Sequence, residues 1–162
     1  MDEHIRRADD FEKNEQAFLL RYLHPGMTVL DVGAHHGLYT LLAAHRVTES
    51  GLVISFEPSP RERKRLSRNV RWNRHSKVRI EPFALGNSPG DATLHICMGR
   101  ETGCNSLRRP SVTERTRTIQ VPVTTLENYL NENKIPHVDF VKLDVEGAEL
   151  DVLSGSSVLL RK

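Results

Sequence analysis

The sequence predicts an α/β domain of the doubly wound type, with a mainly parallel sheet, an N-terminal helix and an inserted β-ribbon. Short runs of continuous apolar residues alternate with segments of helical composition, which is typical of a parallel sheet covered by helices on both faces. Several of the apolar runs end in glycine or acidic residues, as expected where a strand turns into a helix. A chain of 162 residues fits one domain of this kind.

The first third of the chain predicts an entry helix followed by a strand–turn–helix unit. Apolar residues at helical spacing over 9–23 stop at Pro25–Gly26, which indicates an amphipathic helix that ends there. The apolar run 27–33 ends in glycine and is expected to form the first strand. A helix over 38–47 and a second strand over 52–56 are expected to follow.

The residues after the second strand match the start of a helix. Ser59 is a suitable N-cap, Pro60 suits the first helical position, and Glu62 completes a capping box. We therefore expect a helix that runs from Pro60 to about Arg74. A third strand is expected over 78–83, where apolar residues return.

The second half of the chain predicts a ribbon and the remaining core elements. Alternating apolar residues indicate an antiparallel ribbon formed by 92–96 and 118–123. The polar segment 97–117 between them has a length typical of a functional lid or a disordered loop. The remaining elements are a helix opened by a capping box at Thr124–Glu127 and running to about Asn133, a buried strand over 138–143, and a last helix that ends at Gly155.

The composition excludes several classes of protein. The chain has 23 Lys and Arg residues against 21 Asp and Glu, a net charge of +2, which argues against a strongly basic nucleic-acid arm or an acidic disordered tail. Its apolar runs are far shorter than the roughly 20 residues of a membrane span, and no apolar stretch follows Met1. We therefore expect a cytoplasmic protein without membrane contact. Cys97 and Cys104 match no zinc-site spacing and are expected to be reduced thiols.

The turn after the first strand has the sequence Asp31-Val-Gly33-Ala-His35-His-Gly37. A dinucleotide fingerprint would need glycine at positions 35 and 38, and a P-loop would need Gly-Lys-Ser/Thr after the strand, but the sequence contains neither. Because the turn also has no Lys or Arg, we expect a ligand without a polyphosphate group. Gly33 allows a sharp turn, and Gly37 is expected to leave the helix start open to a bulky ligand.

Glu57 ends the second strand, 24 residues after Gly33. A carboxylate there can accept hydrogen bonds from both hydroxyl groups of a ribose, and bonds of this charged kind contribute about 1.5 to 3 kcal/mol. A phosphate-free nucleoside with a cationic tail, which Asp31 would attract, fits these residues better than a nicotinamide dinucleotide does. S-adenosylmethionine has those features.

Longer motifs along the chain carry a family resemblance. They are Leu30-Asp-Val-Gly-Ala, Phe56-Glu-Pro-Ser-Pro, Arg68-Asn69, Ala84-Leu-Gly86, Val121-Pro-Val-Thr-Thr-Leu126 and Asp139-Phe-Val-Lys-Leu-Asp-Val-Glu-Gly-Ala-Glu149. Together they resemble the FkbM-type family of S-adenosylmethionine-dependent methyltransferases over roughly residues 15 to 160. Each motif alone is weak evidence, whereas their joint occurrence in family order is specific.

The resemblance implies a Rossmann-like class I methyltransferase fold. It also implies transfer of the sulfonium methyl group, usually to an oxygen of a small molecule or sugar. The cofactor-binding residues that it implies are Asp31, Gly33, His35 and Gly37 at the methionine end, Glu57 at the ribose, and Phe83 and Ala84 beside the adenine.

Asp144 and Glu146 lie where the family places its carboxylates, beside the transferred methyl group and the acceptor. We expect one of them to act as a general base. They could instead cap the last helix and neutralise a nearby Lys or Arg. No third hard ligand is evident, so no metal site is predicted. His35 and His36 are expected to face solvent unless one of them contacts the acceptor, and Asn105–Ser106 resembles a family position near the substrate.

The resemblance also suggests how the chain is organised. Residues 1–26 are expected to form the N-terminal helix and lead-in, and 27–162 the methyltransferase domain. The family continues into further strands, whereas this chain ends at Lys162, so we expect a domain truncated after the fourth core strand. The alternative function is a degenerate module that binds the cofactor weakly or serves only in interactions. A second copy of the chain would then be a suitable cover for the open sheet edge.

A third alternative depends on the basic segment Arg61–Arg79. It contains nine Lys or Arg residues and one acid, Glu62, and could attract RNA by counterion release. Aromatic residues that could stack on bases are almost absent there apart from Trp72. We therefore favour a solvated helix face and expect no nucleic-acid partner.

Overall fold

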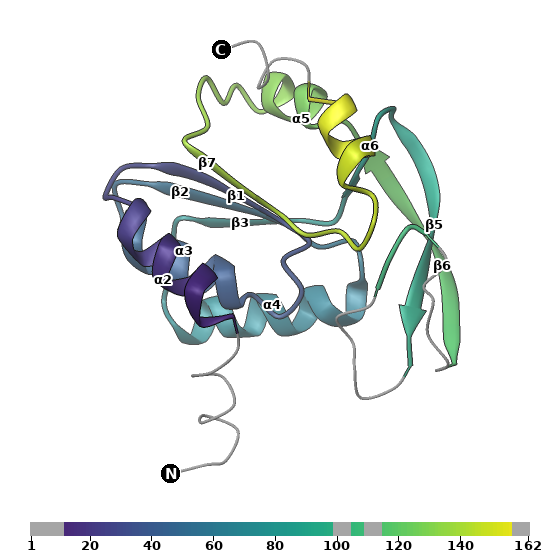
Figure 1. Cartoon of the computed structure of the whole chain (residues 1–162), viewed down its shortest axis with the longest axis horizontal. Coiled ribbons are helices and arrows are strands. Elements are labelled where there is room, and N and C mark those ends of the chain that lie inside the picture. The colour runs from purple at the N-terminus through teal and green to yellow at the C-terminus, as the bar shows by residue number, and fades with distance from the viewer. Residues whose placement is uncertain (1–11, 99–104, 109–114, 157–162) are drawn as a thin grey trace.

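The computed structural model describes residues 12–98, 105–108 and 115–156 (Figure 1). The elements in chain order are α2 (Lys13–Tyr22), β1 (Thr28–Val32), α3 (Leu38–Val47), β2 (Leu52–Phe56), α4 (Pro60–Trp72), β3 (Val78–Glu81), β4 (Ala84–Leu85), β5 (Gly90–Cys97), β6 (Thr116–Thr124), α5 (Leu126–Glu132), β7 (Phe140–Leu143) and α6 (Glu149–Ser154).

A four-stranded parallel sheet in the order β3-β2-β1-β7 forms the centre of the fold (Figure 1). β1 pairs with β2 on one side and with β7 on the other, so the strand order reverses at β1. Val32 lies opposite both Phe56 and Leu143, and the carboxyl ends of these three strands therefore meet at one edge. In open α/β sheets, such a reversal is where a ligand site is expected.

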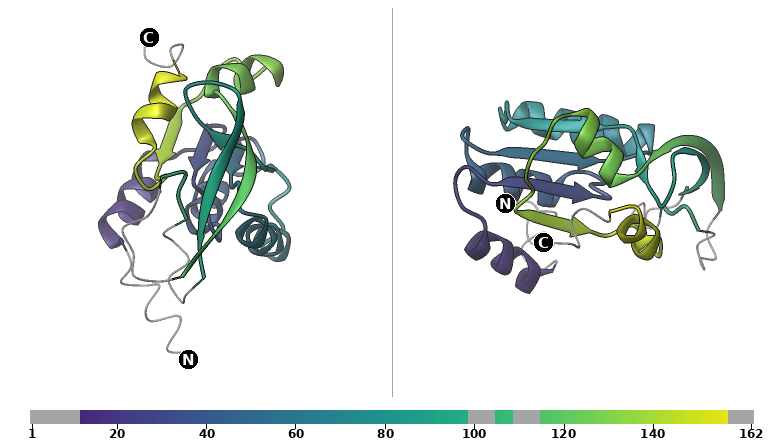
Figure 2. Two further views of the ribbon diagram at one scale, coloured as in Figure 1. Left: turned by 90° about the vertical axis from the view of Figure 1, so that its right-hand side faces the viewer. Right: turned by 90° about the horizontal axis from the view of Figure 1, so that it is seen from above.

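Helices cover both faces of this sheet, which confirms the doubly wound prediction. α2, α3 and α4 lie on one face, and α5 and α6 lie on the other (Figures 1 and 2). Successive strand residues point to opposite faces. Val29 and Val53 pack with α2 and α3, whereas Leu30 and Ile54 pack with α5 and α6. α4 contributes a separate small cluster around Leu66.

The predicted ribbon forms a second sheet, in the order β4-β6-β5, at the side of the parallel sheet (Figure 2). β5 and β6 are antiparallel from the Gly90–Val123 pair to the Cys97–Thr116 pair, so the ribbon is longer than predicted. Ser106, within the long polar segment, pairs with His95 of β5. Residues 99–104 and 109–114 of that segment lie outside the described residues.

The expected third strand over 78–83 is interrupted. β3 ends at Glu81, and the chain then changes sheets, because β4 pairs with β6. Pro82 lies at the break, and a proline has no N–H to donate to the ladder. Phe83 and Ala84 are consequently brought next to the ribbon.

The two predicted capping boxes are not formed. α4 does begin at Pro60, but Ser59 makes no side-chain capping bond, and Glu62 is fully buried in other contacts. At α5 the N-cap is Thr125, one residue later than predicted, and its hydroxyl accepts a hydrogen bond from the N–H of Asn128 at 3.1 Å.

Two further expectations concern partly described segments. The predicted entry helix over 9–23 corresponds to α2, and residues 1–11 lie outside the described residues. Cys97 is disulfide-bonded, so the expectation of a reduced thiol is wrong there. The prediction for Cys104 lies outside the described residues.

Among the described helices, none has the length and apolar character needed to cross a membrane. β7 pairs only with β1 in the part of the chain that the structure describes.

Gly37 precedes α3 and has a packing role, in place of the open approach to a ligand that we expected. Its φ of 92° lies in the left-handed region. A Cβ atom there would lie 2.4 Å from Cδ1 of Leu66, so α4 occupies the space that the missing side chain leaves. Gly26 is a natural comparison, because its φ is 90° but the nearest atom to its Cβ position, the Ser50 hydroxyl oxygen, is 3.9 Å away.

We expect Gly37→Ala to reduce the free energy of unfolding more than Gly26→Ala does. Both changes impose the same backbone strain, and only the first forces a clash, which typically costs about 1–3 kcal/mol. Urea denaturation of both variants measures the difference. Equal losses of stability would contradict a packing role for Gly37.

Candidate functional site

A cavity of about 410 Å³ lies at the carboxyl ends of β1, β2 and β7 and is closed on one side by the ribbon. Its volume is in the range of small-molecule sites. The predicted site residues that line it are Gly33, His35, Glu57, Phe83, Ala84, Asp144 and Glu146. Asp31 and Gly37 are not among the lining residues.

Glu57 joins the two turns that form the floor of the cavity. Its carboxylate accepts hydrogen bonds from the backbone N–H groups of His35 and Ser59, each at 2.8 Å. The side chain of Arg63 donates to the carbonyl oxygens of Glu57 and Pro58. Each carboxylate oxygen retains one further lone pair for a ligand. Burial raises the pKa of Glu57 to about 7, although the two N–H donors oppose the shift.

Asp31 lies beneath the cavity and is 1% exposed. Its Oδ2 accepts a hydrogen bond of 2.6 Å from the Thr40 hydroxyl, and its Oδ1 has no hydrogen-bond partner among the described residues. Lys142 Nζ lies 4.0 Å from that oxygen. Burial raises the pKa of Asp31, and Lys142 opposes the shift. Asp31 therefore ties the end of β1 to Thr40 of α3 behind the cavity and faces Lys142 with its other oxygen.

Lys142 and Tyr39 are site residues that the sequence analysis missed. Lys142 Nζ lies 2.9 Å from Asp144 Oδ2 and 4.8 Å from the centre of the Tyr39 ring. Its ammonium group therefore holds Asp144 at the end of β7 and faces Asp31 as well. A lysine within the otherwise apolar strand Phe140–Leu143 was the signal that could have indicated this role.

The loop after β7 holds Glu146 at the cavity mouth. Glu149 accepts hydrogen bonds from the N–H groups of Val145 and Gly147, and the Ser106 hydroxyl donates to the Glu146 carbonyl at 2.7 Å. Glu146 has a φ of 53°, which is uncommon outside glycine and typical of constrained functional loops. Its side chain is exposed. Partial burial and the neighbouring carboxylates Asp144 and Glu149 raise its pKa, against the effect of Lys142.

The opposite wall of the cavity is apolar. Phe83 and Ala84 line it at the crossing between the two sheets, together with Leu94 of β5. Ala84 and Leu94 belong to one buried cluster. This wall offers an apolar slot to a flat ring.

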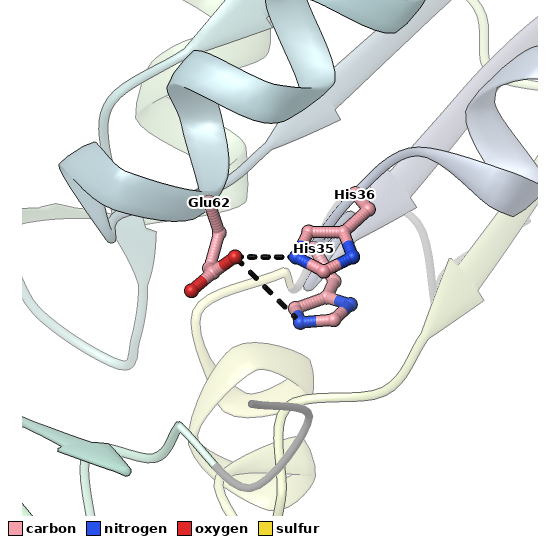
Figure 3. A group of neighbouring side chains, drawn as sticks. All are labelled: His35, His36 and Glu62. Carbon is pink, nitrogen blue, oxygen red and sulfur yellow. Dashed lines mark hydrogen bonds and ion pairs between the residues drawn. The ribbon is translucent and has the colours of Figure 1, made fainter. Parts of the chain in front are cut away.

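His35 and His36 were expected to face solvent, but both are part of a contact with α4 (Figure 3). Their rings stack with centroids 3.7 Å apart. Glu62 approaches both rings, and its side chain is fully buried. Burial, with the adjacent His36, lowers the pKa of His35 to about 4, so this ring is neutral at pH 7.

Comparison with known proteins agrees with this geometry. The model of the Methyltransferase FkbM domain matches residues 31–162. The chain belongs to the FkbM methyltransferase family. Among curated proteins, Methyltransferase 1 of Beauveria bassiana is 28% identical over 147 residues, which cover 78% of this chain and 57% of that protein. The AMB antimetabolite synthetase AmbE of Pseudomonas aeruginosa is 27% identical, and the match covers 82% of this chain but 8% of that protein.

A solved member of the FkbM family has the same fold. The structure of methyltransferase FkbM from Methylobacillus flagellatus aligns with 91% of this chain and 37% of its own chain, at a TM-score of 0.54 and 16% identity. The FkbM chain described here thus spans just over half the length of the Beauveria relative and less of the others. The match confirms the Rossmann-like fold that the sequence predicted.

We expect Glu57→Gln to reduce the free energy of unfolding by about 1–3 kcal/mol. Glutamine keeps one acceptor oxygen but replaces the other with an NH₂ group, which leaves one buried backbone N–H unpaired. Glu132→Gln is the control, because Glu132 is exposed at the end of α5. Denaturation at about pH 5, below the pKa of about 7 that burial gives Glu57, tests this, because the neutral amide is then compared with a neutral carboxyl group and the cost of a buried charge does not enter. Equal stability of the two variants would contradict the role of the Glu57 carboxylate in holding the turns after β1 and β2 together.

Proposed function

We propose that this FkbM-family chain transfers a methyl group from S-adenosylmethionine to an oxygen of a small molecule or sugar. The observation that carries the proposal is the charge of the cavity. Its described lining contains the carboxyl groups of Glu12, Glu57, Asp144 and Glu146, and Lys142 is the one Lys or Arg among them. Such a lining repels polyphosphates and attracts a cationic ligand.

The residues present fit this cofactor. Glu57 offers carboxylate lone pairs to the ribose hydroxyls, and the apolar wall at Phe83 and Ala84 suits an adenine ring. Asp31 lies behind the cavity lining, where its carboxylate can add to the attraction for the cationic end without touching it. When bound, the cofactor supplies an electrophilic methyl group on a positively charged sulfur. Holding an acceptor oxygen in line with such a group lowers a barrier by about 7–11 kcal/mol.

Glu146 is the better candidate for the general base. Asp144 is engaged by Lys142 at 2.9 Å, whereas the pKa of Glu146 is raised and its side chain is exposed at the mouth of the cavity. A base with a raised pKa accepts a hydroxyl proton more readily, and such proton transfer contributes about 10²–10⁴ in rate. We propose that Glu146 takes the proton of the acceptor hydroxyl group and that the negative charge of Asp144 keeps the pKa of Glu146 raised.

The second candidate function is a degenerate module without activity. This candidate stays a prediction. Four further expectations stay predictions. They are a small-molecule or sugar acceptor, the absence of a nucleic-acid partner, a cytoplasmic location, and self-association along the β7 edge. On α4, Lys64, Arg65, Arg68 and Arg71 are exposed, which a solvated helix face and a nucleic-acid surface both require.

We expect S-adenosylmethionine to raise the melting temperature of the chain, because a ligand that binds only the native state stabilises it. At a concentration of 100 times the dissociation constant, the gain is about 2.7 kcal/mol. ATP is the control, since it carries the same nucleoside with a polyphosphate that the acidic lining repels. Scanning calorimetry measures both. No shift with S-adenosylmethionine would favour the degenerate module, and an equal shift with ATP would contradict the charge argument.

We expect Asp144→Asn to move the acid limb of the kcat–pH profile to lower pH. The base must be deprotonated, and the charge of Asp144 raises the pKa of Glu146, so its removal lowers the pH at which activity is lost. Glu146→Gln should lower kcat by about 10²–10⁴. The assay follows S-adenosylhomocysteine release with an acceptor chosen from a panel of hydroxyl compounds. Full turnover of Glu146→Gln with an unchanged profile would exclude this base.

A further inference from the structure

We propose that His35, His36 and Glu62 form a binding site for a divalent transition-metal ion of the zinc type. One ring nitrogen from each histidine and one oxygen of Glu62 lie within 4.8 Å of one another (Figure 3). This grouping lies at the edge of the cavity but uses none of the carboxylates assigned to methyl transfer. The proposal therefore does not depend on the proposed function.

The distances between the ligand atoms are close to those of a tetrahedral site. His36 Nε2 lies 2.5 Å and His35 Nε2 3.9 Å from the same atom, Glu62 Oε2. Zinc holds nitrogen and oxygen ligands at about 2.0–2.2 Å, which places ligand atoms about 3.4 Å apart in a tetrahedron. The first distance must open and the second close by less than about 1 Å, and the two stacked rings, whose nitrogens lie within 4.8 Å of each other, must turn to face one ion. Rotation of the side chains can supply shifts of this size.

The backbone holds the two histidines in place before any ion binds. The N–H of His35 donates to Glu57, and Asn69 Nδ2 of α4 donates to the carbonyl oxygen of His36 at 2.8 Å. His35 has a φ of 50°. A non-glycine residue in this region is strained, and such strain is concentrated at functional sites. The loop after β1 thus presents both imidazole rings to the N-terminal end of α4.

Glu62 supplies the carboxylate ligand from a fully buried position. Its side chain is 0% exposed, and its Oε2 atom lies 2.5 Å from His36 Nε2. Arg61 binds the Oε1 atom, which leaves Oε2 directed at the histidines. A hydrogen bond to one carboxylate oxygen fixes the direction of the other oxygen, as it does for the carboxylate ligands of metal sites in general.

Arg65 currently occupies the point where the ion would bind. Its Nη1 atom lies 2.9 Å from His36 Nε2 and 3.3 Å from Glu62 Oε2. The Arg65 side chain is 45% exposed, so it can turn into solvent. With Arg65 displaced, the charges of Glu62 and Arg61 balance each other. Zinc sites of three neutral histidines show that a negative net charge is not required.

The site would keep one coordination position open toward the cavity. His35 and His36 both line the cavity, and three protein ligands with an open fourth position are typical of zinc sites that bind water or a further ligand. An oxygen ligand such as a carboxylate or hydroxyl group fits that position. Imidazole and carboxylate ligands suit Zn²⁺, Co²⁺ and Ni²⁺ better than Ca²⁺ or Mg²⁺.

Titration of the tag-free, chelator-treated chain with Co²⁺ and Zn²⁺ tests the proposal. We expect one equivalent of Co²⁺ to give the visible absorption of a tetrahedral site, and Zn²⁺ to displace it. His36→Ala should weaken binding at least about tenfold. Arg65→Ala should bind the ion at least as tightly as the unmodified chain, because it removes the competitor. His137→Ala is the control, since His137 is exposed and pairs with Asp139.

Three outcomes would overturn the site. The first is the absence of stoichiometric binding. The second is binding that His36→Ala leaves unchanged, which would indicate an adventitious ion only. The third is weaker binding of the ion by Arg65→Ala than by the unmodified chain. The unfolding free energy of each variant, measured without metal, separates loss of the site from loss of the fold. Because the readout is spectroscopic, it is independent of any methyl transfer.

Discussion

The close backbone approach at the ends of β1 and β7 is the constraint on which the site depends. A Cβ atom on Gly33 would lie 1.9 Å from the carbonyl oxygen of Asp144, so only glycine fits there. The N–H of Asp144 donates to the carbonyl oxygen of Val32 at 3.1 Å and extends the pairing of the two strands to this point. The turn after β1 and the acidic loop after β7 consequently form one wall.

The second contact that shapes the site is the Glu57 carboxylate. It bridges the turns after β1 and β2 through two backbone N–H groups, and with the Gly33–Asp144 contact it links three loops into one frame. Rigid support of this kind is what methyl transfer needs, because the reaction asks mainly for alignment. The non-glycine residues with positive φ at the site, His35 and Glu146, lie on two of these loops, where the frame can support their strain.

Charge distinguishes the two ends of the site. Carboxylates line the end near β7, and Lys142 is placed between Asp31 and Asp144. At the other end, the two histidines meet Glu62, Arg61 and Arg65 of α4, and the positive charges there exceed the negative ones. The cavity therefore joins an acidic pole suited to a cation with a histidine cluster that can exchange an arginine for a metal ion.

The positions of the elements follow closely from local signals in the sequence. Apolar runs and glycine turns predicted the core strands and the helices between them, and the alternation of Ile119, Val121 and Val123 predicted the ribbon. The strand over 78–83 was predicted two residues too long, because the apolar run continues past Pro82, where β3 has already ended at Glu81. Similarly, the Ser59–Glu62 capping pattern is a local signal, and a long-range contact with His36 displaced it.

The sequence by itself determined the α/β class and the family motifs, and seven of the nine site residues that it predicted line the cavity, because strand ends in a parallel sheet converge whatever the details of packing. Only the tertiary structure decided what those residues contact. The role of Lys142, the packing of Gly37 against Leu66, and the meeting of His36 with Glu62, 26 residues away, arise where separate elements come together. Such contacts depend on distances in space, and residue spacing along a single element carries no information about them.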